Sequence, residues 1–208
     1  MLRVALLLFL GLIGLLACLI AVGAVVVHTY EMPNRAMEPL LHLGDRVAEI
    51  PVLFTGGFSR GSLVAFHLPY DQGQNGVGRV VGLPGDRIQV LAGHLIVNGK
   101  PVFEPYLRIT PHAFGVDFPS APNLLIDNRE IRRLQSVMYG ELVIDEALVV
   151  PEGYYFVLGD NRGVAVDSRI YGPVPRNAIF GHPVIVYAAK TAHSGVRWLS
   201  SADLEVNP

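Results

Sequence analysis

The chain has 208 residues, of which 51% are hydrophobic and 16% charged, and its formal net charge is −2. Because no basic field exists to attract phosphates, we expect no binding to nucleic acid. The 22 glycines and 15 prolines predict many turns and exclude a helical bundle for most of the chain. Its single cysteine, Cys18, excludes an internal disulfide framework and a multi-cysteine metal site.

The N-terminal region is apolar from Val4 to Val27, without a charged or strongly polar residue. As a helix this run would extend about 36 Å, which is enough to cross a bilayer. We therefore expect residues 1–28 to form a retained transmembrane anchor. Arg3 favours a cytoplasmic N-terminus, although Arg35 and Arg46 beyond the apolar run weaken the charge asymmetry.

Two alternatives for this region stay open. Ala17, Ala21 and Ala24 would suit the cleavage site of a secretory signal. The string from Leu15 to Cys18 resembles a bacterial lipoprotein box, in which Cys18 would become lipidated. The apolar residues that follow Cys18 favour a spanning helix instead, since a lipidated cysteine normally opens a polar tether.

After residue 28 the sequence changes to short apolar runs separated by Gly and Pro, a pattern typical of an antiparallel β-barrel or sandwich. A hairpin turn is expected at Asn98-Gly99, and a second turn at Pro84-Gly85. The expected strands are 46–52, 62–68, 78–82, 87–91, 94–97, 141–144, 154–158 and 183–188.

The body divides into a β core, an inserted lobe and a tail. Residues 29–103 and 140–190 form the expected core. Residues 104–139 are Pro-rich and then carry Arg and Glu, which predicts a smaller inserted lobe containing a helix. We expect the tail, residues 191–208, to be loosely ordered.

Three local patterns suggest chemistry but lack the context that it needs. Gly57 to Gly61 matches the G-x-S-x-G nucleophile elbow around Ser59, but a strand rather than a helix is expected after it. Gly73 to Gly78 is Gly-rich without a phosphate-loop Lys and reads as a flexible connection. The seven histidines show no metal-binding spacing, so no metal or cofactor is expected.

The densest polar cluster follows the predicted strand 154–158. Two Asp and two Arg there can form hydrogen-bonded ion pairs that hold a loop over a cleft. A salt-bridged turn and a site scaffold explain this composition equally well. The cluster comprises Asp160, Asn161, Arg162, Asp167, Ser168 and Arg169.

Four separated motifs resemble, in order, those of type I signal peptidases, the membrane-anchored serine endopeptidases that remove signal peptides from exported proteins. Residues 32–41 and 44–47 resemble the family pattern P-S-x-S-M-x-P-T-L followed by G-D, and residues 60–66 resemble G-D-[IV]-V-x-F. Residues 78–86 resemble K-R-V-[IV]-G-x-P-G-D, and residues 159–172 resemble G-D-N-R-x-x-S-x-D-S-R-x-x-G.

The departures from the family fall on its chemistry. The family uses a Ser hydroxyl activated by a neutral Lys amine. By resemblance the nucleophile position is Ala36, the base position is Gly78 and the position of the base's hydroxyl partner is Ala165. The side-chain oxyanion donor found in part of the family corresponds to Asn34, whose amide can still donate a hydrogen bond.

The resemblance implies that the scaffold survives. Asp160 would pair with Arg79, and Asp167 with Arg169. The groove that accepts an extended substrate would be walled by Met37, Pro39, Val80, Val81 and Gly82.

These residues predict a non-catalytic relative, outside the bacterial cytoplasmic membrane and anchored in its lipid. It would bind signal peptides or other extended segments, or assist an active peptidase or the secretion machinery. Three alternatives remain: an active endopeptidase that uses Ser59, Ser62 or a His, an active enzyme inactivated by engineered substitution, and a structural β module whose cleft has closed.

Overall fold

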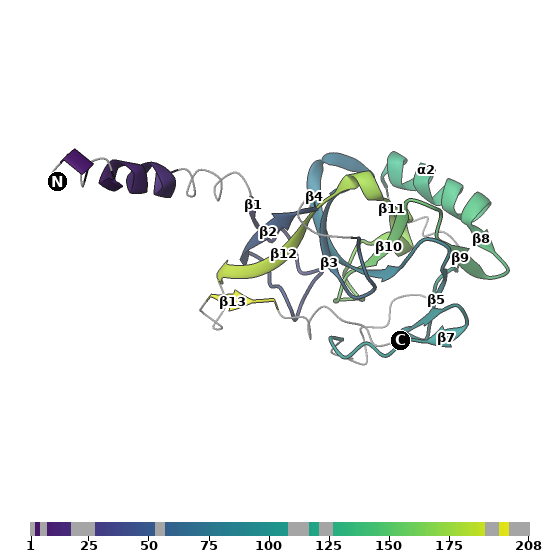
Figure 1. The fold of residues 1–208 in the computed structure, drawn as a ribbon. Helices are drawn as coiled ribbons and strands as arrows, with labels where there is room; N and C mark the ends of the chain where they lie inside the picture. The colour runs from purple at the N-terminus through teal and green to yellow at the C-terminus, as the bar shows by residue number, and fades with distance from the viewer. Residues whose placement is uncertain are drawn as a thin grey trace.

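Two antiparallel sheets make up most of the body, as the alternation of strands and turns predicts (Figure 1). The computed structural model describes residues 3–4, 8–17, 28–52, 57–107, 117–120, 127–189 and 196–199. The larger sheet has the order β1-β2-β12-β3-β4-β10-β11, with β13 paired to β12, and the smaller has the order β7-β6-β5-β9-β8.

The elements have the following bounds. The larger sheet contains β1 (His28–Glu31), β2 (Arg46–Pro51), β3 (Leu63–Leu68), β4 (Asp71–Gly82), β10 (Tyr154–Leu158), β11 (Val174–Pro175), β12 (Ile179–Ala188) and β13 (Arg197–Trp198). The smaller sheet contains β5 (Arg87–Leu91), β6 (His94–Val97), β7 (Lys100–Pro101), β8 (Val143–Ile144) and β9 (Ala147–Val149). The helices are α2 (Arg129–Val137), the π-helix η2 (Met138–Leu142), α3 (Ser168–Tyr171) and the 3₁₀-helix η3 (Arg176–Ala178).

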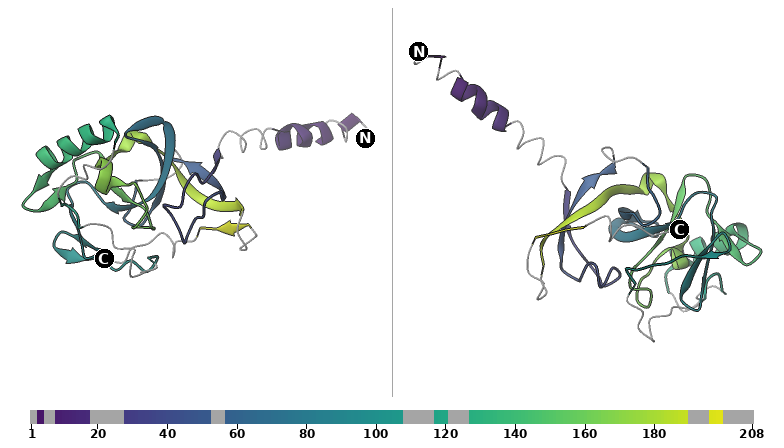
Figure 2. Two further views of the ribbon diagram at one scale, coloured as in Figure 1. Left: turned by 180° about the vertical axis from the view of Figure 1, so that it is seen from behind. Right: turned by 60° about the horizontal axis from the view of Figure 1, so that its bottom comes forward.

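In the N-terminal region, residues 8–17 are helical and all their side chains are exposed. Figure 2 shows this helix on the opposite side of the body from α2. Among the described residues no helix is both long and apolar enough to cross a membrane. Cys18 and much of the run up to Val27 lie outside the described residues.

The two predicted turns are confirmed. Asn98 and Gly99 both have positive φ, at 52° and 77°, and connect β6 to β7. Gly85 has a φ of 85° in the turn before β5. This turn is held by Asp86, whose carboxylate accepts hydrogen bonds from the Leu83 amide at 2.7 Å and from the Asn98 side chain at 2.8 Å.

Strand β4 passes between two apolar cores, which explains why its C-terminal half is buried on both faces. Val80 packs with Phe66 and Val157 in one core. Val81, its neighbour on the opposite face, packs with Ile88 in the other. Successive side chains of a strand point to opposite faces, so burying both requires packing on both sides of the sheet.

The structure corrects three expectations for local structure. Residues 73–78 are not a flexible connection but part of β4, because β3 pairs with them along most of that length. The first half of the strand expected at 141–144 is replaced by the end of η2, and Val143–Ile144 is extended. The tail is ordered at 196–199, where β13 pairs with β12 and Leu199 is buried.

Helix α2 begins where the sequence places a good N-cap. The Asn128 side chain accepts hydrogen bonds from the amides of Glu130 and Ile131 at 2.9 and 3.1 Å. These bonds satisfy two donors that a helix start leaves unpaired. Ile131 and Gln135 are the buried residues of this helix, and Leu134 packs partly buried against one of the apolar cores.

Candidate functional site

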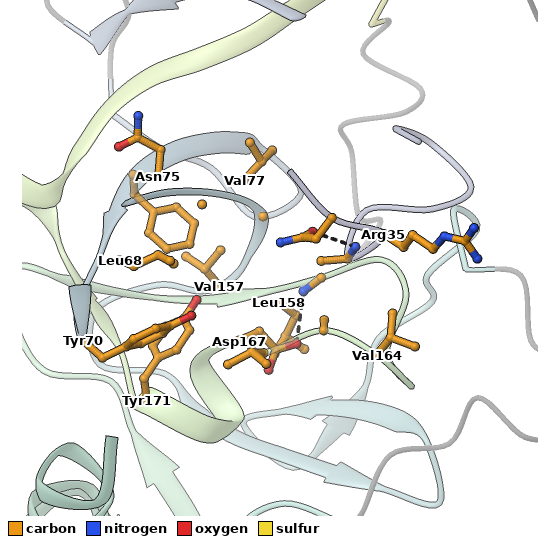
Figure 3. A pocket seen from close by; sticks show the side chains of 18 residues that line it. Arg35, Leu68, Tyr70, Asn75, Val77, Val157, Leu158, Val164, Asp167 and Tyr171 are labelled. Carbon is orange, nitrogen blue, oxygen red and sulfur yellow. Dashed lines mark hydrogen bonds between the residues drawn. The ribbon is translucent and has the colours of Figure 1, made fainter. Parts of the chain in front are cut away.

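A pocket of about 340 Å³ opens between β3, β4, the end of β10 and the segment that follows β1 (Figure 3). Its lining is mostly apolar. The lining residues are Asn34, Arg35, Ala36, Phe66, Leu68, Tyr70, Asn75, Gly76, Val77, Gly78, Val157, Leu158, Gly159, Val164, Ala165, Val166, Asp167 and Tyr171.

The four positions that the sequence motifs associate with the family's chemistry all line this pocket. Asn34 and Ala36 come from the segment before β2, Gly78 from β4, and Ala165 from the loop after β10. An ideal Cβ on Gly159 would lie 2.4 Å from the Cβ of Ala165 and 2.6 Å from the Ala36 carbonyl oxygen. Segments far apart in the chain therefore meet at one site.

Around Gly78 the neighbouring strands occupy the space that a side chain would need. An ideal Cβ there would lie 2.4 Å from Cγ1 of Val157 and 3.6 Å from Cε1 of Phe66. The first distance is shorter than van der Waals contact permits. This position is therefore packed around glycine, and no group at residue 78 can accept a proton.

The segment at Asn34 and Ala36 is fixed by backbone contacts. The Ala36 amide donates to Oδ1 of Asn34 at 2.9 Å, and the Asn161 amide donates to the Ala36 carbonyl at 2.9 Å. A backbone N–H is one of the groups that can stabilise an oxyanion. At Ala36 that donor already has an intramolecular acceptor.

The structure confirms the predicted pair of Arg79, which follows Gly78 in β4, and Asp160, which follows Gly159. Arg79 donates from Nε to Oδ1 at 2.8 Å and from Nη2 to Oδ2 at 2.6 Å, and both side chains are buried. Its third nitrogen donates to the Gly61 carbonyl at 3.0 Å. Burial raises the pKa of Asp160, while the hydrogen bonds and charge of Arg79 act in the opposite direction.

The second predicted pair, Asp167 and Arg169, is also present. Arg169 donates from Nε and Nη2 to the two carboxylate oxygens, each at 2.8 Å. Asp167 is the N-cap of α3 and also accepts from the Gly159 amide at 3.1 Å. The buried Ser168 hydroxyl accepts from the Val157 amide at 3.0 Å. These contacts hold the 159–169 loop against β10.

Two residues of this network were missed by sequence reasoning. Glu104 forms an ion pair with Arg162, and the Tyr106 ring lies under the Arg79 guanidinium at 3.9 Å. The Tyr106 hydroxyl donates to Glu104. No spacing connects residues 104–106 with 160–162, because the contact exists only once the chain has folded. It ties the start of the predicted lobe to the core.

None of the five residues predicted to wall the groove lines this pocket. Met37, Val80 and Val81 are fully buried in apolar cores. Gly82 packs against Ile88 and Phe156. Pro39 is half-buried and does not line the pocket. The apolar motif residues serve the cores, and β3 and β10 supply much of the wall.

The alternative nucleophiles lie away from the pocket. Ser59 and Ser62 hydrogen-bond to each other at 3.0 Å, in a turn that leads into the strand β3 and not into a helix. His182 contacts the Leu63 carbonyl through Nδ1 at 3.1 Å. No group of three His, Cys, Asp or Glu side chains that could hold a metal ion occurs in the described part of the chain.

The pocket lining offers little for acid–base chemistry. Among its described residues there is no Ser, Thr, Cys, His or Lys. The carboxylate in the lining, Asp167, is paired with Arg169. Burial raises the pKa of Tyr70 and Tyr171, so both phenols stay protonated at neutral pH. Of the chain's two lysines, Lys100 is exposed in β7 and Lys190 lies outside the described residues.

Beside the pocket, β4 has an edge that pairs with no described strand. Its pairing with β10 involves only Arg79, Val80 and Gly82, whereas β3 pairs from Asp71 to Arg79. A second pocket of about 200 Å³ shares Asn75, Gly76 and Val77 with the first. The two pockets therefore lie along the same stretch of β4.

Comparison with known proteins agrees with the motif order. The family model described as signal peptidase, peptidase S26, matches residues 3–188. Signal peptidase IB of Staphylococcus aureus strain COL is 34% identical over 165 residues, 78% of each chain. Signal peptidase I of Pseudomonas fluorescens is 30% identical over 185 residues, 77% of this chain and 64% of that protein.

A solved structure is also similar in sequence. A signal peptidase I from Enterococcus faecalis V583 is 30% identical and has a TM-score of 0.45, covering 61% of this chain and 97% of that one. The family match extends over most of the apolar N-terminal region, all four motifs and every described strand before β13. The motif positions meet around one pocket, and the family model matches most of the chain. The chain therefore belongs to the S26 family of signal peptidases.

Proposed function

We propose that this protein is a non-catalytic member of the signal peptidase family that binds signal peptides or other extended segments. One observation carries the proposal: the pocket at the family's catalytic positions holds an alanine at residue 36 and a glycine at residue 78. Peptide hydrolysis by this family's chemistry needs an oxygen nucleophile and a base to take its proton. Without these groups, stabilisation of the oxyanion and binding of the substrate accelerate hydrolysis only modestly.

Binding by strand addition is supported by the edge of β4. An extended peptide can add its backbone hydrogen bonds to an unpaired strand while its alternate side chains enter pockets. Residues 75–77 border both pockets, so one peptide laid along them reaches the two in succession. The intact Arg79–Asp160 and Asp167–Arg169 pairs keep the walls of this site in place.

The family and the apolar N-terminus support a location at the membrane as part of this proposal. Residues 1–28 anchor the chain in the lipid of a bacterial cytoplasmic membrane, with a single pass and the body on the outer side. Residues 29–103 and 140–190 form the binding core, 104–139 the inserted lobe and 191–208 the tail. At this surface the protein presents bound segments to an active peptidase or to the secretion machinery.

The test is peptide binding by the full-length protein in detergent, measured by fluorescence anisotropy. The probe is a fluorescein-labelled peptide that spans the cleavage region of a preprotein. A matched peptide carries N-methyl groups on alternate amides, which removes the donors needed for strand pairing.

We expect the unmethylated peptide to bind and the methylated one to lose most of its affinity. Equal binding of the two peptides would contradict strand addition. Absence of binding to either would overturn the proposed function. Mass spectrometry of the peptide after incubation checks that binding occurs without cleavage.

A further inference from the structure

We infer that the larger pocket accepts one large apolar side chain, leucine-sized or aromatic, from the bound segment. The inference rests on the proposed function and specifies its ligand. It concerns the pocket lined by Ala36, Gly78 and Ala165, at the positions where the family's chemistry would lie.

The volume of the pocket supports a large occupant. A cavity of about 150 Å³ lined by Leu, Ile and Phe is enough to bind a benzene ring. The pocket here measures about 340 Å³. A bound alanine methyl group would fill only a small part of that volume. Water would occupy the rest in contact with apolar walls, whereas a larger apolar side chain would remove this apolar surface from water.

The lining is suited to an apolar ring. Tyr70 and Tyr171 lie side by side with ring centroids 5.6 Å apart, and Figure 3 shows them at one end of the pocket with Leu68 and Val157 beside them. Aromatic rings prefer such tilted or offset partners at about 4.5–7 Å. Phe66 completes this wall from β3.

The rim of the pocket exposes apolar surface that a ligand would cover. Val164 is 59% exposed and Val166 is 48% exposed, and both line the pocket from the loop after β10. Contiguous exposed apolar surface beside a cavity is typical of a binding site. A large side chain bound in the pocket would cover part of this apolar surface.

Two glycines of β4 let side chains of the neighbouring strands pack directly over its backbone at the pocket. Gly76 and Gly78 lie two residues apart on β4, so both face the same side. An ideal Cβ on Gly76 would meet Leu68 at 2.8 Å, as one on Gly78 meets Val157. Because β4 contributes only backbone at these two positions, Phe66 and Leu68 of β3 and Val157 of β10 lie over it and line the pocket.

The occupant is an extended peptide because the pocket is continuous with the edge of β4. Asn75, Gly76 and Val77 belong both to that unpaired edge and to the pocket lining. A peptide paired with the edge projects every second side chain toward one face of the sheet. One of these side chains therefore points into the pocket.

The test uses fluorescein-labelled peptides that differ at one position, which holds Ala, Leu or Phe. Two sets vary adjacent positions, so that either register of the peptide is sampled. Anisotropy titrations use the full-length protein in detergent, the Val166→Trp variant, which fills the rim, and the Val137→Trp control. Val137 is 43% exposed on α2 and does not line the pocket.

We expect the Phe or Leu peptide of one set to bind at least about tenfold more tightly than its Ala counterpart, as one buried large side chain can achieve. Val166→Trp should remove this preference, and Val137→Trp should retain it. Equal or tighter binding of the Ala peptides, or a preference unchanged by Val166→Trp, would overturn the inference and leave peptide binding intact. Absence of binding by all peptides would overturn the proposed function itself.

Discussion

Val157 occupies the space that a side chain at Gly78 would need: an ideal Cβ on Gly78 would lie 2.4 Å from Cγ1 of Val157. The two residues lie on the adjacent strands β4 and β10. Residue 78, which the motif resemblance sets at the family's base position, is therefore packed for glycine by its neighbour. Regaining a base would require a change on β10 as well as on β4.

Restoring the dyad alone should fail. We expect Ala36→Ser with Gly78→Lys to lower the free energy of unfolding by about 1–3 kcal/mol, the usual cost of overpacking, and to cleave no preprotein. Adding Val157→Ala should recover part of that stability by making room. Urea unfolding and a preprotein cleavage assay measure both effects. A double variant as stable as the unmodified protein would contradict the packing argument.

Removing one partner of the buried Arg79–Asp160 pair should be costly. Arg79→Met leaves an unpaired buried carboxylate, and we expect a loss of about 3–5 kcal/mol in the free energy of unfolding. Arg79→Met with Asp160→Leu should cost less than the sum of the single changes.

The matched control for this pair is Arg133→Met. Arg133 contacts Glu130 at 2.8 Å on the exposed face of α2. Its loss should change the free energy of unfolding by less than about 0.5 kcal/mol. If Arg79→Met and Arg133→Met lowered the free energy of unfolding by similar amounts, burial would not explain how much the Arg79–Asp160 pair contributes to stability.

The contact between Tyr106 and Arg79 should stabilise the junction with residues 104–106. Tyr106→Phe removes the hydrogen bond to Glu104 and should cost about 1 kcal/mol. Tyr106→Leu also removes the ring beneath the guanidinium and should cost about 2 kcal/mol more. Chemical unfolding of both variants measures the difference, and equal losses would argue against a role for the ring.

Glu49 should make the protein less stable as the pH rises. Burial raises its pKa from 4.5 to about 7, and Nδ1 of His28 lies 3.6 Å from one of its carboxylate oxygens. Neither oxygen has a hydrogen-bond partner among the residues that the structure describes. The folded state therefore binds this proton more tightly than the unfolded state does. The resulting stability is fully present below about pH 4.5 and is lost as the pH rises through about 7.

The comparison of Glu49→Gln with Glu152→Gln tests this pH dependence. Glu152 is exposed, so its substitution should leave the profile of unfolding free energy against pH unchanged. Glu49→Gln should flatten the decline between about pH 4.5 and 7, because the amide stays neutral. An unchanged slope in Glu49→Gln would assign the decline to other groups.

Local signals in the sequence predicted local structure well. The Asn98-Gly99 turn and the strands around it follow from residues that lie next to each other in the chain. The pairs Arg79–Asp160 and Asp167–Arg169 followed from the family motifs. Those motifs also predicted four positions that the fold brings to one pocket.

The failures concern burial and contacts that depend on the whole fold. An apolar residue of a motif has the same sequence signal whether it lines a groove or a core, so the motif did not reveal that Val80 and Val81 are buried in the two cores. The glycines at 73–78 suggested flexibility, but pairing with β3 makes them a strand. No local pattern marked Tyr106 as a partner of Arg79.

The central claim is tested most directly by incubating a preprotein with the purified full-length protein in detergent. A family member with both Ser and Lys in place serves as the positive control. We predict that the preprotein stays uncleaved over times at which the control cleaves it completely, because neither Ala36 nor Gly78 can supply the chemistry. Cleavage at the signal-peptide junction by the unmodified protein would contradict the account, and its loss in Ser59→Ala or Ser62→Ala would identify the nucleophile.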